Sequence, residues 1–315
     1  MRLVVTGAGG FVGMVMSRTA EAEGHEVVRV VRRGGSASPG LEIVGEIDGR
    51  TDWGDVVDGA DVVIHLAARV HVLREYAKDP LAAFRAVNVE GTRRLAEAAA
   101  TRGVRRLVLV STIKVLGEST SGTPFRPDDP LAPGDPYAQS KLEAELALRQ
   151  VSERAGLEVV IVRPPLVHGP GVGGNLRRLM ALIRSGVPLP FGGVRNRRSL
   201  VGVQNLAALL LRAATVPQAA GQTLLVADQP AISTPALVRL MAESMGRPAR
   251  LWPLPAGVLT GLARLTGRVA EVERLVGSLE VDDQPSRALL AWTPPHTLEE
   301  GIGEMVSAFG RKRTA

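Results

Sequence analysis

The sequence contains no cysteine, few aromatic residues and no long apolar run, and each absence excludes a class of protein. Without cysteine among its 315 residues it can form no disulfide, thiolate metal site or cysteine nucleophile, and we expect a reducing, cytoplasmic location. No run of about 18 apolar residues occurs, so no membrane-spanning helix is predicted. The first residues enter a strand-like segment, Arg2–Thr6, and lack the successive regions of a signal peptide.

The charge is modestly positive. Aromatic residues make up 3% of the chain and the formal net charge is +6. A nucleic-acid-binding surface usually combines clustered basic residues with aromatic side chains, so nucleic acid is not predicted as a partner. A positive balance also suits an anionic small molecule.

Apolar strand-like runs alternate with helical segments through residues 1–170. This alternation predicts right-handed βαβ units and an α/β fold with a doubly wound parallel sheet of the Rossmann type. Ligands bind such sheets beyond the carboxyl ends of the strands. The six predicted strands are Arg2–Thr6, Glu26–Val31, Leu41–Val44, Asp61–Leu66, Arg105–Val110 and Leu157–Val162.

The composition changes after about Gly171, where proline, glycine and arginine become frequent. We predict that residues 1–170 form a dinucleotide-binding domain and residues 171–315 a smaller, less regular substrate-binding lobe. Two segments, Gln204–Ala214 and Gln222–Val226, are candidates to return to the main sheet.

A glycine cluster follows the first strand, in Thr6-Gly-Ala-Gly-Gly-Phe-Val-Gly13, and leads into a helix that reaches Glu23. Glycines allow a tight turn and close approach of the backbone to a pyrophosphate, which the helix N-terminus stabilises. The spacing Gly7-x-x-Gly10-x-x-Gly13 differs from the common G-x-G-x-x-G pattern, although the mechanics are the same. A plain glycine-rich turn is the alternative.

The end of the second strand predicts which dinucleotide is bound. A fold that selects NAD carries an acidic residue there for the ribose 2′-hydroxyl, whereas this chain has Val31-Arg32-Arg33. Guanidinium groups can bind a 2′-phosphate in bidentate fashion, so NADP(H) is favoured and NAD(H) is the alternative. An exposed arginine-rich loop would give the same pattern.

Tyr137 and Lys141 are four residues apart on a helix whose start is indicated by Asp135, a candidate N-cap, and Pro136. A free tyrosine titrates near ~10, and a fixed cation nearby lowers that value toward neutrality. The pair therefore predicts a proton-transfer group. An ordinary amphipathic helix is the alternative.

Taken together, Thr6–Gly13, Ser111-Thr112 and Tyr137-x-x-x-Lys141 resemble the extended short-chain dehydrogenase/reductases, in particular the NAD-dependent epimerase/dehydratase family that acts on nucleotide sugars. The resemblance implies that Tyr137 is the acid/base, that Lys141 lowers its pKa and holds the nicotinamide ribose, and that Thr112 bonds the reacting oxygen. It further implies substrate contacts at Ser111, Thr112, Asn175 and Arg198. The implied cofactor contacts are Gly7, Gly10, Phe11, Val12, Gly13, Arg32, Arg33, Glu46, Ile47, Leu66, Ala67, Ala68, Asn88, Lys141 and Pro164.

Departures from the family pattern refine the predicted reaction. Sugar 4,6-dehydratases carry Asp-Glu after the catalytic threonine, whereas Ile113-Lys114 stand here, so dehydration is not expected. The 4-epimerases often have asparagine where this chain has Leu166. Segments 111–119 and 163–171 look more like 4-keto sugar reductases of bacterial surface-polysaccharide pathways.

The first hypothesis is therefore NADPH-dependent reduction of the 4-keto group of a nucleotide-activated deoxysugar, of the UDP-4-keto-6-deoxy-N-acetylhexosamine type. A UDP-hexose 4-epimerase with bound NAD is the second. A redox-sensing binding module that has lost catalysis, and a steroid- or flavonoid-type ketone reductase, are further alternatives. By the same resemblance a homodimer joined through two helices per subunit is expected.

Overall fold

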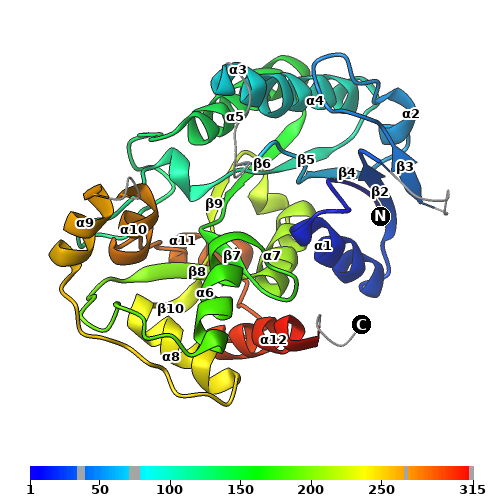
Figure 1. Ribbon diagram of the computed structural model, residues 1–315. Helices are drawn as coiled ribbons and strands as arrows, with labels where there is room; N and C mark the ends of the chain where they lie inside the picture. The colour runs from blue at the N-terminus through cyan, green and yellow to red at the C-terminus, as the bar shows by residue number, and fades with distance from the viewer. Residues whose placement is uncertain (34–39, 71–78, 266–268, 312–315) are drawn as a thin grey trace.

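A seven-stranded parallel sheet forms the centre of the computed structural model, which describes residues 1–33, 40–70, 79–265 and 269–311 (Figure 1). The strand order β3-β2-β1-β4-β5-β6-β9 has a reversal at β1/β4, as a doubly wound sheet requires, so the predicted fold class is confirmed. The strands are β1 (Arg2–Thr6), β2 (Glu26–Val31), β3 (Leu41–Ile43), β4 (Val62–His65), β5 (Arg106–Val110), β6 (Glu158–Arg163) and β9 (Thr223–Leu225).

Helices cover both faces of this sheet because its strands are apolar on both sides. Leu3 and Val5 face a core that also contains α1 and α7, whereas Val4 faces a core with α2, α4 and α5. The helices are α1 (Phe11–Ala22), α2 (Gly54–Val57), α4 (Gly91–Thr101), α5 (Pro136–Ala155) and α7 (Val203–Thr215).

The helical segment from Pro80 to Thr101 is interrupted. It consists of α3 (Pro80–Arg85), a π-helical turn at Ala86–Glu90 and α4. The π-helical turn contains the buried Asn88, and such turns are frequent at functional sites.

The second half of the chain contributes to both parts of the molecule. Helix α7 packs against α1, and β9 is the edge strand beside β6. The remaining strands form a small sheet of order β10-β8-β7, with β7 (Leu166–His168) parallel and β10 (Asp228–Ile232) antiparallel to β8 (Arg198–Gly202).

A separate apolar core lies beneath this small sheet, around α6 (Gly174–Ser185), α8 (Thr234–Ser244) and α12 (Leu298–Arg311). Three further helices, α9 (Ala256–Leu265), α10 (Val269–Val276) and α11 (Gln284–Leu290), complete this half. Figure 1 shows α9 and α10 at the side of the molecule opposite β2 and β3. Within the described ranges, no helix is both long and apolar enough to cross a membrane.

Candidate active site

The predicted glycine motif forms a tight turn between β1 and α1. Gly7 has a φ of +69°, and a Cβ there would lie 2.8 Å from the backbone nitrogen of Ala67. Gly10 precedes α1 without a side-chain cap, so the first-turn amides are available to an anion. Phe11 and Val12 are half-buried in that first turn. The motif thus brings the ends of β1 and β4 within backbone contact, as a dinucleotide cradle requires.

Gly13→Ala is expected to disrupt this turn. A Cβ at Gly13 would lie 2.2 Å from the carbonyl oxygen of Gly7, a distance at which the backbone must move. We expect a loss of unfolding free energy of about 3 kcal/mol and loss of dinucleotide affinity, measured by urea unfolding and fluorescence titration. Gly9→Ala is the matched control, because its Cβ would meet only Val31, at 3.5 Å. If Gly13→Ala lost no more unfolding free energy or dinucleotide affinity than Gly9→Ala, the close approach of Gly13 to Gly7 would be contradicted.

A buried polar network connects the ends of β1 and β4 to the π-helical turn. Thr6 Oγ1 accepts hydrogen bonds from the amides of Leu66 and Ala67, both at 3.2 Å, and lies 2.6 Å from His65 Nδ1. The other ring nitrogen of His65 is 3.0 Å from Thr92 Oγ1. Burial, with a smaller contribution from Lys141, lowers the pKa of His65 to about 3. His65 is therefore a neutral, hydrogen-bonded histidine at the end of β4.

This histidine makes the protein sensitive to acid. Its pKa is 6.5 ordinarily and about 3 when folded, so the unfolded chain takes up the proton first as the pH falls. The contribution of the neutral His65 to the unfolding free energy is intact above pH 6.5 and is lost as the pH falls toward 3. We expect the unfolding free energy to fall in that window by about 1.4 kcal/mol per pH unit more than in His65→Gln, measured by urea unfolding. If the unfolding free energies of the wild type and of His65→Gln fell in parallel with pH, His65 would not be a neutral buried group.

Asn88 connects the loop after β4 to the tyrosine helix. Its Oδ1 accepts from the Arg69 amide at 2.8 Å, and its Nδ2 donates to Arg69 O at 3.0 Å and to Ser140 Oγ at 2.9 Å. Ser140 Oγ in turn donates to the carbonyl of Tyr137 at 2.8 Å. The amide of Asn88, predicted to border the cofactor, is thus engaged in positioning the segments on either side. Ala68 lies in the loop after β4, which Asn88 holds through Arg69.

Tyr137 lies in the first turn of α5, which begins as predicted. Asp135 is the N-cap, its carboxylate accepts from the Ala138 amide at 2.7 Å, and Pro136 is the first helical residue. Tyr137 is half-buried and packs edge-on against Phe84, with ring centroids 6.0 Å apart. Burial, followed by the charge of Asp135, raises the pKa of Tyr137 to about 12. In the protein alone the pKa of Tyr137 is thus raised by burial and by Asp135, and not lowered as the resemblance to the family implies.

Lys141 is itself buried, with 1% of its surface exposed. Burial lowers its pKa to about 8, and the neighbouring Glu145 opposes that shift. Glu145 forms a buried two-point ion pair with Arg163 at the end of β6, with N–O distances of 3.1 and 2.7 Å. No hydrogen bond of the Lys141 ammonium occurs within the described part of the chain. A buried cation in this state can serve an incoming hydroxyl group.

Three of the predicted substrate residues line one cavity of ≈ 330 Å³: Thr112 after β5, Asn175 in the first turn of α6, and Arg198 at the start of β8. Burial lowers the pKa of Arg198, as does Arg274, while Glu118 opposes the shift. The cavity wall is otherwise mainly aliphatic and includes the half-exposed Leu166. It can hold a molecule with an apolar portion and an anionic group beside Arg198 and Arg274.

Ser111 and Pro164 lie just behind the cavity. The hydroxyl of Ser111 is buried and, within the residues described, has no hydrogen-bond partner. The carbonyl of the buried Pro164 accepts from the Ile113 amide at 3.0 Å, so the loop after β6 fixes the residue that follows Thr112. A buried hydroxyl without a partner among the described residues, next to Thr112, fits a site completed by ligand.

The predicted adenine end lies at the opposite edge, beside β2 and β3. Here the exposed carboxylate of Glu46 pairs with Arg32 at 3.4 Å and Arg33 at 3.7 Å. Ile47 is buried against Gly91 at the start of α4, where a Cβ would lie 2.7 Å from Ile47 Cγ2. The two arginines predicted to bind a 2′-phosphate are thus already partnered by a carboxylate in this structure.

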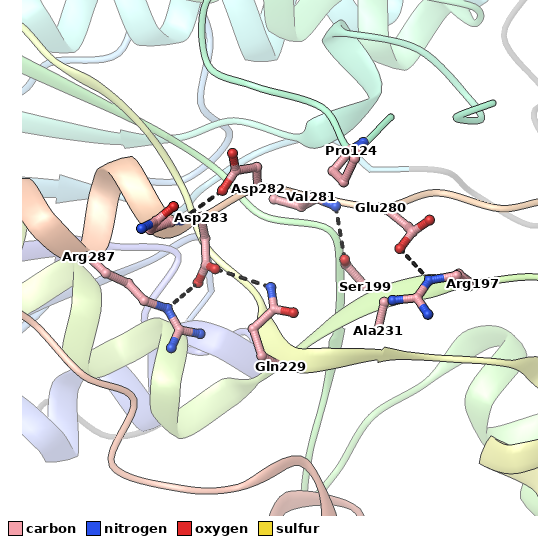
Figure 2. Close-up of a pocket in the computed structure, with 11 residues that line it drawn as sticks. Pro124, Arg197, Ser199, Gln229, Ala231, Glu280, Val281, Asp282, Asp283 and Arg287 are labelled. Carbon is pink, nitrogen blue, oxygen red and sulfur yellow. Dashed lines mark hydrogen bonds and ion pairs between the residues drawn. The ribbon is translucent and has the colours of Figure 1, made fainter. Parts of the chain in front are cut away.

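A second cavity, of ≈ 370 Å³, lies on the other side of Ser199 (Figure 2). Its charged side chains face one another: Arg197 donates to Glu280 at 2.6 Å, and Arg287 donates to Asp283 at 2.7 Å. The first ion pair joins the residue before β8 to the segment that precedes α11, and the second joins α11 to its own N-cap residue. Although slightly larger, this cavity has charged side chains that pair with one another, whereas the first cavity holds three of the predicted substrate residues and is the better candidate active site.

Sequence reasoning did not identify Thr6, Lys114 and Glu118 as site residues. Thr6 was part of the glycine motif but had no role of its own. Lys114 and Glu118 both line the active-site cavity and form an ion pair at 2.7 Å. The spacing of opposite charges four residues apart, just after Ser111-Thr112, was the available signal.

The residues present fit a dinucleotide. Gly7 and Gly13 leave backbone room that a Cβ would fill, the first turn of α1 can bind an anion, and Lys141 and Ser111 have polar groups that a ligand can satisfy. The fold and site together define an NAD(P)-dependent oxidoreductase with a Rossmann domain.

The comparisons with known proteins agree. The chain belongs to the NAD-dependent epimerase/dehydratase family, whose model matches residues 3–227. A UDP-glucose 4-epimerase of Vibrio cholerae is 39% identical over 311 residues, covering 98% of this chain and 95% of the relative. The structure of MoeE5 in complex with UDP-glucose and NAD is 25% identical, covers 100% of both chains and has a TM-score of 0.79. A UDP-N-acetylglucosamine 4-epimerase from Bacillus cereus shares the fold, with a TM-score of 0.81 at 18% identity, covering 98% of this chain and 99% of that one.

Proposed function

We propose that the protein is a nucleotide-sugar 4-epimerase, which inverts the configuration at C4 of a UDP-hexose. The observation that carries this proposal is the single cavity in which Thr112 faces the same space as Asn175 and Arg198. The names of the Vibrio cholerae relative and of the MoeE5 complex support a UDP-sugar as substrate. Because of that relative, epimerisation now stands before the reduction that the sequence favoured.

The chain's own residues would divide the work as follows. Tyr137 removes the proton from the 4-hydroxyl and later returns it, while Thr112 and Lys141 hydrogen-bond the same oxygen. A nicotinamide dinucleotide held beside them would supply the hydride chemistry at C4. Gly7, Gly10 and Gly13 would hold its pyrophosphate, and Lys141 its ribose.

Arg198 would bind the diphosphate of the substrate. Burial and the neighbouring Arg274 both destabilise the charged form of the Arg198 guanidinium. A doubly charged anion bound beside it would offset both effects, so the binding of a diphosphate is favoured there. The aliphatic wall around Leu166 and Leu200 would exclude water from the sugar during the reaction.

Reduction of a 4-keto nucleotide sugar is the second candidate function. It is favoured by Arg32 and Arg33, which would bind the 2′-phosphate of NADP(H) once released from Glu46. For either function we infer a cytoplasmic enzyme of surface-polysaccharide biosynthesis that acts as a homodimer.

One experiment separates the two functions. The freshly purified protein is extracted and its dinucleotide identified, and the protein is then incubated with UDP-glucose, UDP-N-acetylglucosamine and their 4-keto counterparts. Retained NAD and interconversion of 4-epimers without net cofactor consumption is the expected result. Consumption of NADPH with a 4-keto sugar only would favour reduction, and no turnover of any of these sugars would overturn both.

A further inference from the structure

Lys114 lies at the junction between the cavity and the tyrosine helix. It belongs to the 3₁₀ turn Ile113–Val115. The N-cap of this turn is Thr112, whose Oγ1 accepts a hydrogen bond from the Lys114 amide at 3.3 Å. Its ammonium forms ion pairs with Glu118, at 2.7 Å, and with Asp135, the N-cap of α5. The side chain is 19% exposed and that of Asp135 is 16% exposed, so water screens their pairing only in part.

Asp135 has two effects on the tyrosine helix. One carboxylate oxygen caps it through the Ala138 amide, and the other receives Lys114. Asp135 stands two residues before Tyr137, and its negative charge opposes formation of the phenolate. Without a cation beside it, this carboxylate would disfavour the phenolate form of Tyr137, which the proposed proton transfer requires.

We propose that Lys114 is a positioning residue of the active site, which fixes the N-cap of the tyrosine helix and neutralises the Asp135 carboxylate, two residues before Tyr137. The inference rests on the proposed function in giving Tyr137 a proton-transfer role. It adds a link from the cavity wall, which Lys114 and Glu118 line, through Asp135 to the tyrosine helix.

The other charged groups near Tyr137 are paired elsewhere. On α5, Lys141 faces Glu145, which is bound by Arg163 from β6. From α3, Arg85 pairs with Glu143 at 2.6 Å. From β4, His65 is neutral, and the π-helical turn presents the uncharged Asn88. Among the ion pairs formed between described residues, the cation that pairs with Asp135 is Lys114.

The ionisation of Tyr137 can be read without any substrate. The chain has two tyrosines, so Tyr76→Phe leaves Tyr137 as the only phenol, and its phenolate is followed by ultraviolet absorbance while circular dichroism confirms folding. In this background, Asp135→Asn keeps the N-cap but removes its charge. We expect the midpoint of the Tyr137 phenol titration to fall by about one pH unit. Lys114→Met should give less phenolate than the parent at every pH at which both are folded.

The combination of the two substitutions decides the inference. In the Asp135→Asn background, Lys114→Met should have no further effect, and Lys114→Arg alone should restore the parental curve. Arg85→Met, which removes an exposed ion pair to the same helix, should leave the curve unchanged. An equal effect of Lys114→Met with and without Asp135, or no fall of the midpoint in Asp135→Asn, would overturn the proposal.

The kinetic arm tests the same link in the working enzyme. For Lys114→Met we expect the acidic limb of the kcat/KM profile to move up by about one pH unit, with kcat rather than KM carrying the loss. A raised KM with an unmoved limb would mean that Lys114 contacts substrate directly, and would overturn the proposal. If the wild type turns over no nucleotide sugar, the proposed function fails, while the phenol titration still decides the role of Lys114.

Discussion

Tyr137→Phe is expected to lower kcat by about 10³-fold while dinucleotide binding is retained. The substitution removes the hydroxyl, the only group of the side chain with an ionisable proton, and keeps the ring that packs edge-on against Phe84. None of the cradle residues at the start of α1 is changed, so cofactor affinity should stay within about twofold of the wild type. Turnover of the UDP-hexose that the wild type converts, and fluorescence titration with NAD(H), measure the two quantities.

Tyr76→Phe is the matched control, because it removes the chain's other phenol. It should retain turnover. If Tyr137→Phe kept more than a tenth of the wild-type kcat, Tyr137 would have no part in proton transfer, and another group would have to carry it.

Glu145→Gln is expected to destabilise the protein by about 3 kcal/mol, since it leaves the charge of Arg163 buried and unpaired. The side chains of Arg163 and Glu145 are 5% and 2% exposed, so water cannot replace the lost carboxylate charge. The same change removes the charge that supports the ammonium form of Lys141, so its pKa should fall further below about 8. Urea unfolding measures the first effect.

Glu143→Gln, two residues earlier on the same helix, provides the comparison. Glu143 pairs with Arg85, whose side chain is 49% exposed, and such surface pairs contribute about 0–1 kcal/mol. Similar losses in the two variants would show that burial does not distinguish the pairs.

Features that depend on local sequence could be predicted. The strands β1 and β2 were predicted with the bounds that the structure gives, because each is a short apolar run ending at glycine or arginine. The start of α5 was predicted from Asp135 and Pro136, whose cap chemistry is a property of neighbouring residues.

Features that depend on distant residues could not be predicted. The pairing of Arg32 and Arg33 with Glu46 joins segments on separate strands. The raised pKa of Tyr137 follows from burial in the folded chain and from a carboxylate on the cap, neither of which is visible in the Tyr-x-x-x-Lys spacing. The π-helical turn at Asn88 likewise reflects its hydrogen bonds to Arg69 and Ser140.

The return of α7 and β9 to the main sheet has a consequence for hybrid enzymes. Leu206, Leu210 and Leu224 share one apolar core with Leu3 and Val5. A chimaera that exchanged everything after residue 170 for a relative's sequence would therefore replace part of the interior beneath the nucleotide site. Grafts intended to change sugar preference should leave α7 and β9 native and alter only side chains around the cavity mouth.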